Sequence, residues 1–275
     1  MRRYSSAAIL LLASCARQPI AAPTPAPAPQ RPSVAVVPAP VVRAPAAVVT
    51  RTPAVSDSTV PFERPNGTLL RASTLVYDLS VTRAGQPVAL GIRTVSVVES
   101  QMGGAPGWLI SETRTGTALE TSDSLFVSRT ELTPTRWAAS VGKTQLAASM
   151  TRDTLFGAMQ TYQGRSSFTI ALPPGVLLTP GMVERVVELL PLQLGYRAAA
   201  AIVLLELGSP RAVAAQLSVD REERLSLASG TVDCWVVTLR AGAMEERLWV
   251  GKEPSRVVKT EQTVATGIVA ATLRM

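Results

Sequence analysis

The chain has 275 residues, of which 47% are hydrophobic and 4% aromatic, so it is long and apolar enough to fold around a sizeable core. It contains no histidine and only two cysteines. This composition excludes Cys/His zinc sites, Ser-His-Asp triads and Cys-His nucleophiles built from this chain alone. We expect neither a metal site nor a cofactor.

The net charge of +7 is distributed in a way that does not indicate nucleic-acid binding. Six of the 27 Lys/Arg residues and one of the 20 Asp/Glu residues precede residue 61, which leaves 21 and 19 for the rest of the chain. A phosphate-binding surface needs a dense local positive field, and residues 61–275 contain neither a basic run nor interleaved aromatic residues. We therefore expect no nucleic-acid partner.

The first 15 residues follow the pattern of an export signal. Arg2 and Arg3 form a positively charged start, residues 7–13 are apolar (AAILLLA), and small residues then lead to Cys15. A helix needs about 20 apolar residues to span a bilayer, so this shorter run predicts a cleaved signal rather than a permanent anchor.

Residues 12–15 (LASC) resemble the lipobox of bacterial lipoproteins. The resemblance implies a signal peptide of residues 1–14, acyl chains on Cys15, and a membrane as the partner of these chains. Several acyl chains form a durable anchor, whereas one holds only marginally. Ala16 stands where Asp is the inner-membrane retention signal, so the resemblance favours the outer membrane, facing the periplasm. The alternative is an ordinary signal peptide with a chance cysteine.

Residues 15–65 form a segment rich in proline and alanine. Ten of the chain's 21 prolines fall between residues 16 and 60. Proline lacks a backbone donor and favours extended polyproline conformations, so this segment cannot build a sheet or a core. We expect a lipid-anchored, disordered tether. A docking ligand for an aromatic-lined groove is the alternative.

Residues 66–275 predict a mainly β domain. Segments rich in Val, Thr, Leu and Ile are separated by Gly and Pro turn signals, such as 103–107 (GGAPG) and 251–254 (GKEP). This close spacing favours antiparallel hairpins, because parallel crossovers need a dozen or more residues. The expected strands are 69–81, 88–99, 108–115, 124–132, 136–141, 144–151, 166–172, 231–240, 244–250, 256–264 and 268–274.

One segment, 180–190, predicts an amphipathic helix with Pro180 at its first position. Its apolar face consists of Met182, Val183, Val186, Val187 and Leu190, and its opposite face consists of Glu184, Arg185 and Glu188. Residues 198–205 (AAAAIVLL) are ambiguous, because alanine favours a helix whereas the short length and the following Gly-Ser-Pro favour a buried strand. We prefer the strand.

Two segments resemble a family of bacterial envelope proteins with no assigned function. Residues 232–258 follow its pattern C-W-x-V … W-[IV]-x-K-x-x-x-x-V-V, and residues 190–196 (LPLQLGY) are similar to its L-P-L-x-x-G-Y segment. That family is similar in outline to the lipoprotein-localisation superfamily. The similarity implies a strongly curved antiparallel sheet, or unclosed barrel, whose apolar cavity is covered by one or a few helices.

In such a fold the possible cavity cover is Met182, Val183, Val186, Val187 and Leu190, and the ligand is a lipid or another hydrophobic molecule. The sequence contains one clear helix where the superfamily has several. A sheet filled by its own side chains, with no cavity, is the alternative.

Ser140 and Lys143 have the S-x-x-K spacing of penicillin-recognising enzymes, in which lysine serves as the base for serine. Between two β-like segments, however, Gly142 and Lys143 favour a hairpin turn. The carboxylate pairs 222–223 and 245–246 would point to opposite faces of a strand, which favours exposed charges or salt bridges. Cys234 favours a small buried side chain rather than a redox centre.

We therefore expect no catalytic residues and a membrane-tethered envelope lipoprotein whose curved sheet binds an amphiphile or an envelope protein. The alternative is a structural or assembly adaptor with a filled core, which acts through an exposed sheet edge. A hydrolase that uses Ser140 and Lys143 is a remote alternative.

Overall fold

The computed structural model describes residues 60–116, 120–172, 177–206, 209–264 and 267–274. The expected signal peptide (1–14), Cys15 and residues 16–59 of the expected tether lie outside these residues. Within the described ranges, no helix combines the length and the hydropathy that crossing a membrane requires.

Sixteen strands, one α-helix and one short 3-10 helix, η1 (Gly67–Leu69), make up the folded body. Its strands form where apolar and polar residues alternate, as in β2 (Ser73–Arg83), where Leu75, Tyr77, Leu79 and Val81 are buried. The other strands are β1 (Val60–Pro61), β3 (Gln86–Met102), β4 (Ala105–Thr115), β5 (Thr121–Ser128), β6 (Pro134–Val141), β7 (Thr144–Met150), β8 (Thr154–Thr161), β9 (Gly164–Ala171), β10 (Leu177–Leu178), β11 (Arg197–Glu206), β12 (Ser209–Leu227), β13 (Gly230–Ala241), β14 (Met244–Lys252), β15 (Ser255–Val264) and β16 (Gly267–Leu273).

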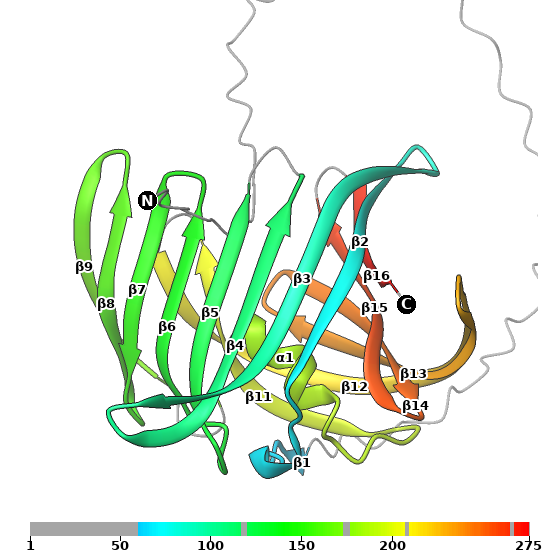
Figure 1. The fold of residues 1–275 in the computed structure, drawn as a ribbon, viewed down its shortest axis with the longest axis horizontal. Coiled ribbons are helices and arrows are strands. Elements are labelled where there is room, and N and C mark those ends of the chain that lie inside the picture. Colours follow the sequence, from blue (N-terminus) through cyan, green and yellow to red (C-terminus); the bar gives the residue numbers. More distant parts are fainter. Residues whose placement is uncertain (1–59, 117–119, 173–176, 207–208, 265–266, 275) are drawn as a thin grey trace, which may run out of the picture. The chain divides into compact units, whose positions relative to one another are not determined.

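Fourteen of these strands form one antiparallel ladder, in the order β11 to β16 followed by β2 to β9. The two halves of the ladder meet where β16 pairs with β2, with Leu273 opposite Tyr77. The short strands β1 and β10 pair in parallel with β11. The sheet curves around the helix without closing into a barrel (Figure 1). The expected mainly β fold with an unclosed, strongly curved antiparallel sheet is confirmed.

The ambiguous segment 198–205 lies in strand β11, as preferred from its length. Four further strands were not expected from the sequence: the two-residue strands β1 and β10, and the longer β8 and β12. The charged run 220–224 (DREER) within the 19 residues of β12 hides its alternation, although Leu217 and Val219 face the core. Phe62 is also buried, and its N–H donates to the Ala199 carbonyl at 3.0 Å, so the folded body includes residues 60–65 that the sequence assigned to the tether.

The helix α1 (Pro180–Val187) lies on the concave side of the sheet (Figure 1). It begins at the expected residue and ends at Val187, with Glu188 as its C-cap. The apolar side chains of the helix and the following Leu190 belong to the main core, and the helix contacts β4, β5 and β11. These side chains are Met182, Val183, Val186, Val187 and Leu190. The opposite face is buried as well, because Glu184 and Arg185 are only 5% and 3% exposed. The amphipathic pattern therefore indicates two kinds of buried neighbour, apolar and charged, rather than a solvent-exposed side.

Candidate functional site

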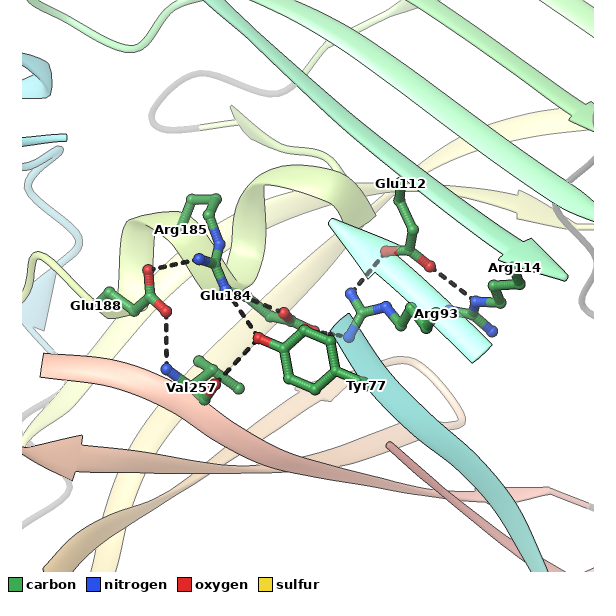
Figure 2. A network of polar contacts seen from close by, with 8 residues as sticks. All are labelled: Tyr77, Arg93, Glu112, Arg114, Glu184, Arg185, Glu188 and Val257. Atoms are coloured by element: carbon green, nitrogen blue, oxygen red, sulfur yellow. Dashed lines mark hydrogen bonds and ion pairs between the residues drawn. The ribbon is translucent and has the colours of Figure 1, made fainter. Parts of the chain in front are cut away.

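A buried network of charged and polar groups joins α1 to the concave face of the sheet (Figure 2). Its members come from five elements: Tyr77 (β2), Arg93 (β3), Glu112 and Arg114 (β4), Glu184 and Arg185 (α1) with the C-cap Glu188, and Val257 (β15). In the ladder Tyr77 lies opposite Arg93, and Arg93 lies opposite Arg114, so strand register places these side chains on one face.

Arg93 is the centre of this network. Its guanidinium lies 2.6 Å from Glu112 Oε2 and 2.6 Å from Glu184 Oε1, so it links β4 to the helix. Arg114 Nε lies 2.7 Å from the other oxygen of Glu112. Burial opposes ionisation of Glu112, but Arg93 and Arg114 outweigh burial and lower its pKa to about 2. Glu112 is therefore ionised at neutral pH.

A second set of contacts ties the C-terminal end of α1 to β15. Arg185 Nη1 lies 2.9 Å from Glu188 Oε2, and the Val257 N–H donates to Glu188 Oε1 at 2.7 Å. The Tyr77 hydroxyl donates to the Val257 carbonyl at 3.0 Å and accepts from Arg185 Nη2 at 3.4 Å. Because Tyr77 belongs to β2, these contacts hold β2, α1 and β15 together across the concave side.

Three carboxyl groups in or beside the network have raised pKa values: the buried Asp123, the network member Glu188 and the half-buried Glu246. Burial raises the pKa of Asp123, of Glu188 and of Glu246 to about 7 each. The negative charge of Glu112 adds to the shift of Asp123, and that of Glu184 adds to the shift of Glu246. Asp123 accepts a hydrogen bond from Trp137 Nε1 at 3.0 Å and lies beside Gly181 in the first turn of α1.

The network acts as a clamp because its charges are largely engaged with one another. The Nε atoms of Arg93 and Arg185 are buried without a hydrogen-bond partner, while the terminal nitrogens of both residues form ion pairs. Within the described ranges, no group of three or more His, Cys, Asp or Glu residues is placed to hold a metal ion. The arrangement fixes the position of α1 on the sheet.

Two adjoining hollows lie on the opposite, outer face of β5–β8. The first has a volume of about 450 Å³ and is bordered by polar side chains, among them Ser122, Ser140, Gln145, Gln160 and Arg165. The second, of about 370 Å³, is more apolar and is lined by Met102, Leu109, Phe126, Arg136 and Phe156 among others. Both hollows are also lined by Ser124, Ala138 and Ala147, and α1 contributes to neither.

The residues singled out from the sequence lie in several places. Ser140 lies on β6 and borders the first hollow, and Lys143 lies in the exposed two-residue turn between β6 and β7, as the turn pattern predicted. Glu245 pairs with Arg240 and Arg247 at 3.0 and 3.1 Å, whereas its half-buried neighbour Glu246 lies on the opposite face of the strand, across from the core residue Leu239. Cys15 lies outside the described residues.

Cys234 lies in a second, smaller core on β13, with Leu75, Tyr77 and Trp249 among its members. Burial raises the pKa of its thiol to about 11, which keeps the sulfur protonated and poorly nucleophilic. This position agrees with the small buried side chain expected from the sequence.

This network was not among the sites expected from the sequence. Its strand members carry a recognisable signal, because Arg93 falls at the same alternation phase as the buried Val95 and Val97. A charged residue on the apolar side of a strand implies a buried partner of opposite charge. The identity of that partner, Glu184 on the helix, cannot be read from the pattern.

Comparisons with known proteins show a similarity in fold to solved structures, one of which is described below. No protein-family model matches the chain, and no curated protein matches it. A crystal structure described as a β-barrel-like protein of a domain of unknown function, DUF1849, from Brucella abortus aligns with a TM-score of 0.49 and 11% identity. The alignment covers 74% of this chain and 96% of that one.

Proposed function

We propose that this protein is a non-catalytic lipoprotein of the cell envelope, anchored by acyl chains on Cys15, whose body binds an amphiphile on the outside of its curved sheet. The lipobox-like residues 12–15 and the proline-rich segment that follows support the anchor and the tether. The absence of Asp at position 16 supports the outer membrane, facing the periplasm.

The observation that carries the proposed binding mode is the burial of the apolar face of α1 against the concave side of the sheet. Met182, Val183, Val186 and Val187 are at most 2% exposed, and Leu190 is 9% exposed. These residues belong to the main core, which supports a binding site on the other face of the sheet. An apolar ligand then has its best contacts in the hollows on the outer face of β5–β8.

Mass spectrometry of the native protein in mild detergent tests the proposal. The expected result is a mature chain that begins at Cys15, carries acyl chains and retains a co-purified amphiphile. Replacement of Cys15 by Ser is expected to leave the signal peptide uncleaved and the chain free of acyl groups. A native protein with an unmodified Cys15 would refute the anchor, and a chain free of any amphiphile would refute the binding function.

A second candidate is an adaptor that binds an extended segment of another protein along β9. The β11 edge is paired with β1 and β10, whereas β9, at the other end of the ladder, pairs with β8 in regular register. Residues 164–167 of β9 are exposed, and exposed, regular edges accept additional strands. A photo-crosslinker at Ser167 is expected to capture a partner in native envelopes, and one at the exposed Ala214 of β12 is not.

A further inference from the structure

We infer that the two outer hollows form one groove that binds the acyl chain of an anionic amphiphile, with the chain at Phe126 and Phe156 and the headgroup near Arg165. This inference rests on the proposed function and assigns its site and its ligand class. We call this site the outer groove and define it by the residues that line the two hollows.

Strand register explains why the two hollows are continuous. Three rows of outward-facing residues cross the strands β5 to β9, and the middle row consists of Ser124, Ala138, Ala147, Ala158 and Ser167. The middle row contains only serine and alanine and forms the floor of the groove, and the two adjacent rows, which carry the large side chains among these three rows, form its two ends. Ser124, Ala138 and Ala147 line both hollows, which joins them along the strand direction.

The two rows at the ends of the groove differ in polarity. One row contains Ser122, Ser140, Gln145, Gln160 and Arg165, and the other contains Phe126, Arg136, Ser149, Phe156 and Thr169. Phe126 is 5% exposed, but Phe156 is 43% exposed, and Met102 at the same end of the groove is 37% exposed. Exposed large apolar side chains beside a hollow are typical of a binding surface. One end of the groove therefore presents Phe126, Phe156 and Met102, with Arg136 as its one charged lining side chain, and the other end is rich in hydrogen-bonding groups, as an amphiphile requires.

The charge of the groove selects the headgroup. The only charged side chains among the described lining residues are Arg136 and Arg165, and the lining contains no carboxylate. Neither arginine takes part in a hydrogen bond or an ion pair within the described ranges of the chain, in contrast to Arg93, Arg114 and Arg185. Arg165 lies at the polar end, where a carboxylate or phosphate headgroup can form two parallel hydrogen bonds to its guanidinium.

The dimensions agree with a single acyl chain. Ser122 and Phe126 are four residues apart on β5, a distance of about 13 Å at the usual strand rise. The hollows, of about 450 and 370 Å³, fall within the volume range of about 300–1,000 Å³ of small-molecule sites. The position of the Phe126 ring requires glycine at Gly107, because a Cβ at that residue would overlap the ring.

Isothermal titration calorimetry with dodecanoate tests the inference on the full chain carrying Cys15→Ser, which cannot be acylated. Ala147→Trp fills the floor of the groove at an exposed position and is expected to weaken dodecanoate binding at least tenfold. The matched control, Ala214→Trp, adds the same side chain at an exposed alanine of β12, outside the groove, and is expected to leave binding unchanged. Circular dichroism establishes that both variants are folded.

Dodecyltrimethylammonium, which has the same chain length and the opposite charge, tests the headgroup assignment. It is expected to bind at least tenfold more weakly than dodecanoate, and Arg165→Gln is expected to reduce this preference severalfold. Equal binding of the two amphiphiles would overturn the anionic ligand class. Dodecanoate binding that Ala147→Trp leaves intact would overturn the groove but retain the proposed function. A chain that binds neither probe and yields no co-purified amphiphile would overturn both.

Discussion

Loss of Arg93 is expected to destabilise the protein more than loss of any exposed charge. Its side chain is 6% exposed and lies between the side chains of Glu112 and Glu184, which are 11% and 7% exposed. Arg93→Met keeps an unbranched side chain at this position but removes its charge. Glu112 then retains only Arg114 as an ion-pair partner, and Glu184 retains only Arg185, at 3.4 Å. Removing one partner of a buried ion pair costs about 3–5 kcal/mol, because it leaves an uncompensated buried charge.

Urea unfolding followed by circular dichroism measures this loss. For a body of this size, about 3–5 kcal/mol corresponds to a fall in Tm of roughly 6–20 °C. The triple variant Arg93→Met, Glu112→Leu, Glu184→Leu removes both carboxylates together with the cation and is expected to recover much of the stability. Arg240→Met, which breaks an exposed pair with Glu245, serves as the control and should leave the midpoint almost unchanged. A loss of less than about 1 kcal/mol in Arg93→Met would refute the clamp.

Three further outcomes follow from the described contacts. Because the pKa of Asp123 is raised from 3.8 to about 7, the folded state binds more protons than the unfolded state between these values, so stability should fall as pH rises from about 4 to 7. Asp123→Asn should flatten this fall in urea titrations at several pH values, and an unchanged slope would contradict the assignment. Gly107→Ala should lower Tm, because its Cβ would overlap the Val127 carbonyl and the Phe126 ring, whereas Gly181→Ala, with contacts of 3.7 Å or longer, should be tolerated. Cys234 should react with a thiol reagent only on unfolding, and rapid modification of the native protein would disprove its burial.

Most of the strands could be predicted because each hairpin is local in sequence. Alternation within β2, β3 and β13 is set by which side chains face the core, and the intervening Gly-rich turns mark the ends. β12 was missed because residues 220–227, its second half, are exposed or half-buried. Neither face of this part of the strand is apolar enough to produce a regular alternation. The position of a strand thus depends on local pattern only where one of its faces is buried.

The helix was predicted at the right place, but its environment was not. Its residues Glu184 and Arg185 look like solvent-exposed charges when only the helix is considered. Their partners Arg93 and Tyr77 lie about a hundred residues earlier in the chain, on strands whose phase becomes known only when the ladder is assembled. The outer groove has the same origin, because its floor combines single small residues from neighbouring strands.

The pairing of β16 with β2 has a consequence for how the protein matures. Translation delivers the amino-terminal portion first, so the strands β2 to β9 are made long before β16, which borders β2. Strands β2–β9 and β11–β16 each consist of sequential hairpins and can begin to assemble separately. The β2–β16 pairing, with Leu273 opposite Tyr77, forms only when the end of the chain is available. Until then the unpaired edge of β2 can accept strands from other chains, which makes the partly folded chain prone to association.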